Sequence, residues 1–276
     1  MIMSEKKLYG HPKSLNDTPT KYCGGCGHGV IHRIIAEVID EMGLRERAII
    51  TNPVGCSIWA DLYFNFDSVQ PAHGRTPAAA TGVKRVLPGH LVVCYQGDGD
   101  MAAIGTAEMI HAANRGEKFT TIFVNNAIYG MTGGQMAPTT LVGQKATTSP
   151  RGRDPEKAGM GYPIRVAELL ATLDGSVYIA RGAVNNAANV RKTRAYIKKA
   201  LELQMGGLGF TMVEVLSQCP TGWGMEPDAA ADWMEKNMFP VFPIGEVKKP
   251  ASEPNIKPVA AKLAGTGEGS AGKGAA

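Results

Sequence analysis

The sequence has no long hydrophobic run and little net charge. No stretch of its 276 residues reaches the roughly 18 apolar residues of a membrane span. The opening segment, MIMSEKKLYG, lacks the apolar core of a secretory signal. The formal net charge is +4, and part of it lies near the C-terminus, so no nucleic-acid surface is expected. These absences predict a cytoplasmic protein with no membrane span and no nucleic-acid partner.

Cysteine is also scarce. There are five cysteines, an odd number in a chain too long for a disulfide-stapled scaffold, so reduced thiols are the better interpretation. Cys23 and Cys26 form a CxxC pair, and Cys56 and Cys219 likewise stand in loops beside glycine or proline. Cys94 lies within the apolar run LVVCYQ and is expected in the core. Four loop thiols predict a four-cysteine metal site, and spacing alone admits either zinc or a [4Fe–4S] cluster.

Hydrophobic residues make up 44% of the chain and charged residues 20%, which is typical of a globular protein. Apolar periodicity predicts helices over 28–42, 76–86, 101–115, 164–173 and 186–204 and strands over 47–51, 91–96, 120–126, 177–184 and 210–216. The apolar face of the first helix is formed by Val30, Ile31, Ile34, Ile35, Val38, Ile39 and Met42. Alternation of helix and strand predicts an α/β fold with a mostly parallel sheet.

Segments without such periodicity bound this fold. Residues 1–20 are predicted to be an irregular N-terminal arm, and residues 127–162 form a long loop of a kind that is usually functional or partly disordered. Residues 247–276 contain almost no large apolar side chain, which predicts a disordered tail. One folded domain over residues 21–246 is therefore expected.

The strongest local signal is Gly97-Asp98-Gly99, followed after 25 residues by Asn125-Asn126. Each group is expected at the carboxyl end of a strand, with GDGD as a turn, and open α/β sheets bind ligands at that edge. The next helix offers N–H groups to a phosphate, and Asp98 and Asn126 offer oxygen ligands to Mg²⁺. The alternative is that GDGD is only a turn and NN only the loop that ends a strand. The spacing of the two motifs across a strand–helix–strand unit favours a diphosphate site instead.

The GDG and NN segments together resemble the thiamine-diphosphate motif. Four further motifs resemble those of one family that carries it. They are CGGCGH at 23–28, GCS at 55–57, HGR at 73–75 and YGMTGGQ at 129–135. Over residues 20–245 the sequence resembles the β subunits of 2-oxoacid:ferredoxin oxidoreductases. The resemblance implies a three-layer thiamine-diphosphate-binding domain of the PP type.

The resemblance also implies the site residues. Mg²⁺ would be held by Asp98, Asn126 and the main-chain carbonyl of Ile128, and the catalytic residues would be His73, Arg75 and Thr132. The four loop cysteines, Cys23, Cys26, Cys56 and Cys219, would hold a [4Fe–4S] cluster. The implied cofactor-binding residues are Gly55, Cys56, Ser57, His73, Gly97, Asp98, Gly99, Asp100, Asn126, Ile128, Tyr129, Gly130, Met131 and Thr132.

The activity implied by the resemblance is thiamine-dependent oxidative decarboxylation of a 2-oxoacid to acyl-CoA and CO₂. Electrons would pass through the cluster to ferredoxin. No second α/β repeat supplies the glutamate that activates thiamine, so an α-type partner subunit is expected to complete the site. A γ subunit and a ferredoxin-like δ subunit are expected as further partners.

The substrate is predicted from the apolar residues Ile58, Trp59 and Met131, which offer no cation to a second carboxylate. The run YGMTGGQMAPTT looks most like the 2-ketoisovalerate group, so a branched-chain 2-oxoacid is favoured, with 2-oxoglutarate and pyruvate as alternatives. Two hypotheses of other classes stay open. One is a non-oxidative thiamine decarboxylase or synthase with structural zinc, and the other is a non-catalytic assembly subunit.

Overall fold

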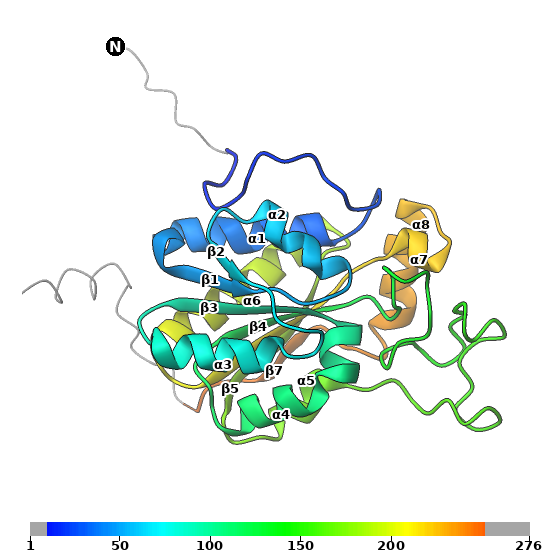
Figure 1. The fold of residues 1–276 in the computed structure, drawn as a ribbon. Coiled ribbons are helices and arrows are strands. Elements are labelled where there is room, and N and C mark those ends of the chain that lie inside the picture. Colours follow the sequence, from blue (N-terminus) through cyan, green and yellow to red (C-terminus); the bar gives the residue numbers. More distant parts are fainter. Residues whose placement is uncertain (1–9, 252–276) are drawn as a thin grey trace, which may run out of the picture.

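A seven-stranded sheet forms the centre of the computed structural model, which describes residues 10–251 (Figure 1). The strand order is β2-β1-β3-β4-β6-β5-β7, and every neighbouring pair is parallel except β5 and β7. The strands are β1 Ala48–Thr51, β2 Asp67–Val69, β3 Leu91–Gly97, β4 Thr120–Asn125, β5 Ser176–Ala183, β6 Phe210–Leu216 and β7 Gly245–Lys248. The predicted α/β fold with a mostly parallel sheet is confirmed.

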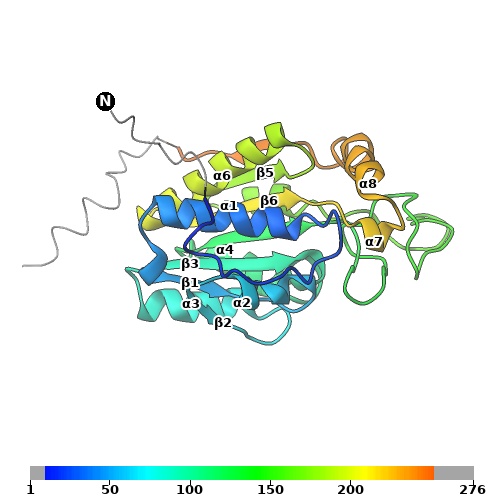
Figure 2. The same cartoon turned by 90° about the horizontal axis from the view of Figure 1, so that it is seen from above.

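Helices cover both faces of the sheet, which gives three layers. The helices are α1 His28–Glu41, α2 Ala60–Tyr63, α3 Thr76–Val86, α4 Thr106–Asn114, α5 Val166–Ala171, α6 Ala187–Met205, α7 Pro220–Trp223 and α8 Pro227–Trp233. Helices α1 and α6 pack side by side on one face (Figure 2), and α3, α4 and α5 cover the other. Within residues 10–251, no helix combines the length and apolarity that crossing a bilayer requires.

The core lies on both sides of the central strands. In β3, Val93 and Tyr95 pack with the α1 and α6 layer, whereas Val92 and Cys94 pack with α3 and α4. A parallel strand buried on both faces is a continuous apolar run, which is why LVVCYQ shows no alternation. Cys94 is fully buried as predicted. Val30 is 37% exposed, so its placement on the apolar face of α1 was wrong.

The GDGD segment is not a turn, which corrects the prediction. Gly97 ends β3, Asp98 and Gly99 are already helical, and a π-helical turn over Asp100–Ile104 follows directly. Gly105 then separates this turn from α4, so the predicted helix over 101–115 is divided. A Cβ atom at Gly105 would lie 2.6 Å from the carbonyl oxygen of Gly74. Because Gly105 has no side chain, the loop after β2 can pack against the π-helical turn that follows β3.

Five of these helices and strands, α2, α7, α8, β2 and β7, escaped prediction because they are short and lack an apolar period. Strand β2 is exposed along its whole length, helices α7 and α8 each begin at a proline, and β7 is a four-residue antiparallel edge. Lys248 of β7 pairs with Ile179, so the sheet extends beyond the predicted boundary at 246. The rest of the predicted tail, from 252, lies outside the described residues, as do residues 1–9 of the predicted arm.

The segment between β4 and α5 contains no helix or strand, yet it is folded around one buried side chain. Arg153 is 6% exposed, and its guanidinium donates to six main-chain carbonyls within the loop. The acceptors are Ala137, Pro138, Thr140, Met160, Gly161 and Tyr162. A single planar cation replaces the hydrogen-bond ladder that a regular element would provide.

We predict that Arg153→Lys opens this loop, because an ammonium group cannot reproduce the planar fork and leaves buried carbonyls without donors. A loss of about 2 kcal/mol or more in unfolding free energy is expected. Limited proteolysis between residues 137 and 162 and a thermal melt measure it. Arg151→Lys, at an exposed position in the same loop, is the matched control. Equal cleavage of the two variants would contradict the role given to Arg153.

Candidate active site

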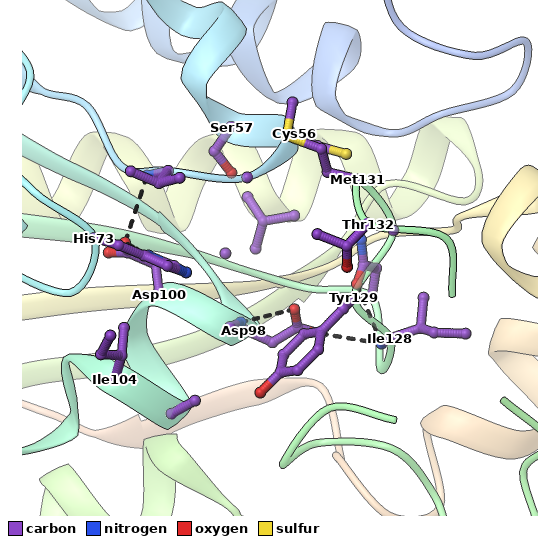
Figure 3. A pocket seen from close by; sticks show the side chains of 18 of the residues that line it. Cys56, Ser57, His73, Asp98, Asp100, Ile104, Ile128, Tyr129, Met131 and Thr132 are labelled. Carbon is purple, nitrogen blue, oxygen red and sulfur yellow. Dashed lines mark hydrogen bonds and ion pairs between the residues drawn. The ribbon is translucent and has the colours of Figure 1, made fainter. Parts of the chain in front are cut away.

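A cavity of about 230 Å³ opens at the carboxyl ends of β1, β3 and β4 (Figure 3). Its walls are the segments that leave the sheet there, namely Val54–Ser57 after β1, Gly97–Asp100 after β3 and Ile128–Thr132 after β4. These segments meet because the strands are parallel and adjacent, so that their carboxyl ends share one edge. All fourteen predicted cofactor-binding residues line this cavity. Their individual roles stay predictions.

Three groups that carry oxygen meet at one end of the cavity. The side-chain amide of Asn126 lies 3.0 Å from Oδ2 of Asp98 and 2.6 Å from the carbonyl oxygen of Ile128, and it donates N–H to both oxygens when no cation is bound. If the amide turns over, its own oxygen faces the same point as the other two. Neighbouring oxygens around an octahedral Mg²⁺ ion are roughly 3 Å apart, given ligand distances of about 2.1 Å. The donor set therefore fits Mg²⁺.

Asp98 is the charged member of this set and is 5% exposed. Its carboxylate accepts hydrogen bonds from the main-chain N–H of Gly99 at 3.0 Å, the N–H of Ile128 at 3.1 Å and the hydroxyl of Thr139 at 3.0 Å. Burial nevertheless raises the pKa of Asp98 to about 7, because the hydrogen bonds offset only part of the lost hydration. A buried carboxylate of this kind is stabilised by a metal ion.

The turn that presents Asn126 and Ile128 is held in a strained conformation. Between them Ala127 has φ +56°, the only positive φ of a non-glycine residue in the described range. The side chain of Asn125 accepts the Ala127 N–H at 3.1 Å and donates to Glu214 at 2.7 Å. Glu214 in turn is paired with the buried Arg181 at 2.8 Å. The strain is thus maintained by a buried charged network that reaches across β6 to β5.

His73 and Asp100 form a second polar pair in the wall of the cavity. Nδ1 of His73 lies 2.5 Å from the fully buried carboxylate of Asp100 (Figure 3). Asp100 also accepts hydrogen bonds from Val54, Gly74, Thr76 and Gln96. With five protein donors, Asp100 chiefly fixes the loops after β1 and β2. Nε2 is then the His73 ring nitrogen left to face a ligand.

The four loop thiols lie near the same turn, and none is in a disulfide. A Cβ atom at Gly130 would lie 3.2 Å from Sγ of Cys219 and 3.7 Å from Sγ of Cys56. Burial, with a smaller contribution from neighbouring thiols, raises the pKa of Cys26 to about 11 and that of Cys219 to about 12. Such thiols ionise readily only beside positive charge, so their chemistry fits a bound metal centre.

The thiols are not closed around a common point. Among residues 10–251, no three His, Cys, Asp or Glu side chains converge closely enough to hold a metal ion. This absence does not argue against the Mg²⁺ site, because only one of its three ligands, the Asp98 carboxylate, belongs to these residue types, and the others are an amide and a carbonyl. The four thiols lie near one another but do not surround one point, so the [4Fe–4S] cluster stays a prediction.

Comparison with known proteins agrees with this geometry. Residues 54–215 match the family described as thiamine pyrophosphate enzyme, C-terminal TPP binding domain. This range contains every residue that lines the cavity except His28. The chain belongs to the thiamine pyrophosphate enzymes.

Relatives within this family are oxidoreductase subunits. The chain is 46% identical over 258 residues to the ketoisovalerate oxidoreductase subunit VorA of Methanothermobacter thermautotrophicus, covering 90% of this chain and 54% of VorA. It is 38% identical to the 2-oxoglutarate synthase subunit KorB of Methanocaldococcus jannaschii, covering 75% and 72%. The chain thus spans about half the length of the VorA relatives.

A solved structure extends the similarity to almost the whole chain. It is a 2-oxoglutarate:ferredoxin oxidoreductase from Magnetococcus marinus with 2-oxoglutarate, coenzyme A and succinyl-CoA bound. The TM-score is 0.72 at 28% sequence identity, with 94% of this chain and 91% of the other covered. The expected thiamine-diphosphate-binding fold is therefore confirmed.

Three residues predicted for the site of this thiamine pyrophosphate enzyme do not line its cavity. Arg75 is 48% exposed in its side chain and forms an ion pair with Glu108. Ile58 and Trp59 end the 3-10 turn Cys56–Trp59, whose first two residues do line the cavity, and Lys21 lies 5.1 Å from the Trp59 ring. The roles predicted for these three residues stay predictions.

The apolar lining residues Val54, Ala103, Ile104 and Val124 were not predicted, and two polar contributors were also missed. His28 lines the cavity, and its Nδ1 lies 2.6 Å from the hydroxyl of Tyr95. Burial lowers the pKa of His28 to about 4, so its ring is neutral. The motif CGGCGH includes this histidine, so a signal was present. Thr139, which donates to Asp98, lies in the irregular loop and stands in the quoted run YGMTGGQMAPTT, but it was given no role.

We predict that Asp98→Asn abolishes Mg²⁺-dependent binding of thiamine diphosphate while the metal-free protein melts at least as high as wild type at pH 8. The raised pKa of Asp98 means that ionisation costs stability, beginning above its unfolded-state value near 4 and complete above about 7. An uncharged amide avoids that cost. Isothermal titration and melts in EDTA at pH 5 and pH 8 measure both effects.

The control for this experiment is Asp67→Asn, an exposed carboxylate on β2 that does not line the cavity. It should change neither affinity nor the pH dependence of melting. Retained cofactor affinity in Asp98→Asn would show that Asp98 is not a metal ligand.

Proposed function

We propose that this chain is the thiamine-diphosphate-binding subunit of a 2-oxoacid:ferredoxin oxidoreductase. The observation that carries the proposal is the turn after β4. Its Asn126 and Ile128 oxygens face Asp98 on one side, and its Gly130 packs against the thiols of Cys56 and Cys219 on the other. A metal–diphosphate site and a thiol site thus share one short segment, as coupled decarboxylation and electron transfer require.

In this proposal Asp98, Asn126 and the Ile128 carbonyl would hold Mg²⁺, which would offset the negative charge of the diphosphate. Thiamine diphosphate, when bound, supplies the carbon nucleophile and the electron sink for decarboxylation. His73 is oriented through Nδ1 by Asp100, so that Nε2 can hold or exchange a proton with the ligand. Thr132 lines the cavity beside the same turn and can donate to the diphosphate.

The four-cysteine site is proposed to hold a [4Fe–4S] cluster rather than zinc. Cys56 itself lines the cavity, so the cysteine site adjoins the proposed thiamine site. Zinc has no redox chemistry, whereas a [4Fe–4S] cluster would supply a one-electron acceptor there. In the proposed reaction the C–C bond to the carboxylate of the 2-oxoacid breaks to release CO₂, the acyl carbon forms a C–S bond with coenzyme A, one proton is released, and ferredoxin would take up the two electrons.

Partner subunits are proposed because the cavity is incomplete. Ile104 and Met131, at its rim, are 52% and 44% exposed, a state that apolar side chains rarely keep at a working site. The chain also spans only about half of VorA. An α-type subunit is proposed to cover the rim, with γ and ferredoxin-like δ subunits carrying electrons away.

A branched-chain 2-oxoacid is the proposed substrate. Among the described residues that line the cavity there is no Lys or Arg, whereas Val54, Ala103 and Val124 add apolar surface. A second carboxylate would lose its hydration there without a partner. The 46% identity to VorA points the same way. 2-Oxoglutarate is the second candidate, favoured by the KorB relatives and the Magnetococcus marinus structure, and it would require a cation from the partner.

The test uses the multisubunit complex purified without oxygen and an artificial one-electron acceptor. We expect thiamine-dependent reduction, with kcat/KM for 2-ketoisovalerate exceeding that for pyruvate within roughly 10–200-fold, since extra methyl groups are worth only a few kcal/mol. Rejection of 2-oxoglutarate should be stronger. A preference for 2-oxoglutarate would overturn the substrate, and reduction that is independent of thiamine diphosphate would overturn the function.

The ligand set of the cluster gives a separate prediction. Cys219→Ser should lower iron content and the brown absorbance at about 400 nm, because a hydroxyl is a poor ligand for iron in a cluster. Cys94→Ser should keep the iron, because Cys94 is buried in the core and its sulfur contacts the side chain of Gln96 at 3.4 Å rather than the loop thiols. The reverse result, or zinc in place of iron, would refute the proposed cluster and favour a non-oxidative enzyme or an assembly subunit.

A further inference from the structure

Trp223 joins the two proposed cofactor sites through hydrogen bonds at both ends. Its indole Nε1 donates to the main-chain carbonyl of Asn126 at 3.0 Å. Its main-chain N–H donates to the carbonyl of Cys219 at 2.9 Å. One residue at the end of α7 therefore contacts both the turn with the metal-binding oxygens and the cysteine from which α7 begins.

Two glycines let these segments approach without intervening side chains. A Cβ atom at Gly222 would lie 2.7 Å from Sγ of Cys219 and 3.1 Å from Cγ2 of Ile128. At Gly130 it would lie 3.2 Å from the same sulfur. Because the segments are in direct contact, a shift of Cys219 would also shift the turn that contains Ile128 and Gly130.

We propose that Trp223 is a positioning residue that ties the Asn126 carbonyl to α7, so that an ordered cysteine site raises the affinity of the metal–diphosphate turn. This inference deepens the proposed function and depends on it. Rotation of the peptide after Asn126 would move the Asn126 side chain and the Ile128 carbonyl together. Mg²⁺ tolerates little departure from octahedral geometry, so a small rotation weakens binding.

The indole is itself held in place. Trp233 of α8 packs against it with ring centroids 4.7 Å apart, and Trp223 is the one whose N–H reaches Asn126. The pair provides a matched comparison, since either ring can be replaced by phenylalanine but only one replacement removes this donor.

The experiment measures thiamine diphosphate binding with Mg²⁺ in the complete, iron-loaded complex. Trp223→Phe should weaken the affinity about tenfold, the loss expected when one hydrogen bond to a buried carbonyl is removed. Trp233→Phe should change it less than about twofold, and iron content should be equal in both. With Mn²⁺ in place of Mg²⁺, the electron paramagnetic resonance spectrum should change in Trp223→Phe alone, a signature that a loss of general stability would not produce.

Removal of the iron tests the coupling. In wild type it should weaken thiamine diphosphate binding, and in Trp223→Phe it should have a smaller effect, because the connection is already lost. If Trp223→Phe does not fold, Gly222→Ala probes the same contact, since it pushes Cys219 and Ile128 apart. Equal affinities in all variants, or equal sensitivity to iron removal, would overturn the inference. Wild type that binds no thiamine diphosphate at all would instead overturn the proposed function.

Discussion

The side-chain amide of Asn126 lies 3.0 Å from Oδ2 of Asp98 and 2.6 Å from the carbonyl oxygen of Ile128, at the carboxyl edge of the sheet. Asp98 is buried there, and burial raises its pKa to about 7, because a buried carboxylate loses its hydration. The convergence of these groups requires the parallel pairing of β3 with β4, which brings the ends of the two strands together. The cavity, the polar pair beside it and the thiol loops are all arranged around this edge.

Buried polar groups away from the cavity maintain the arrangement. The Arg181 and Glu214 pair is fully buried, and Glu214 holds Asn125, whose side chain fixes the positive φ of Ala127. Replacing such a pair by apolar residues is often neutral for stability, so its presence here is better explained by the geometry that it imposes on the turn. The loop organised by Arg153 serves the same end, since it contributes Thr139 to Asp98. Much of the interior is therefore devoted to positioning one short segment.

The rim of the cavity differs in chemistry from its closed end. The closed end of the cavity is polar and preorganised, whereas the open end has exposed Ile104 and Met131. A thiamine site that excludes water needs a second surface there.

The sequence by itself determined the fold class, the central strands, and the residues that gather at the cavity, because buried parallel strands are continuous apolar runs and GDG and NN mark their carboxyl ends. It did not determine where side chains point once a strand ends. Arg75 pairs with Glu108, Ile58 and Trp59 do not line the cavity, and His28 and Thr139 reach the site from a helix and an irregular loop. Those directions depend on close packing at Gly105 and on the donors gathered by Asp100 and Arg153, contacts between residues far apart in the chain. Local periodicity carries no information about such contacts, so only the tertiary structure decided them.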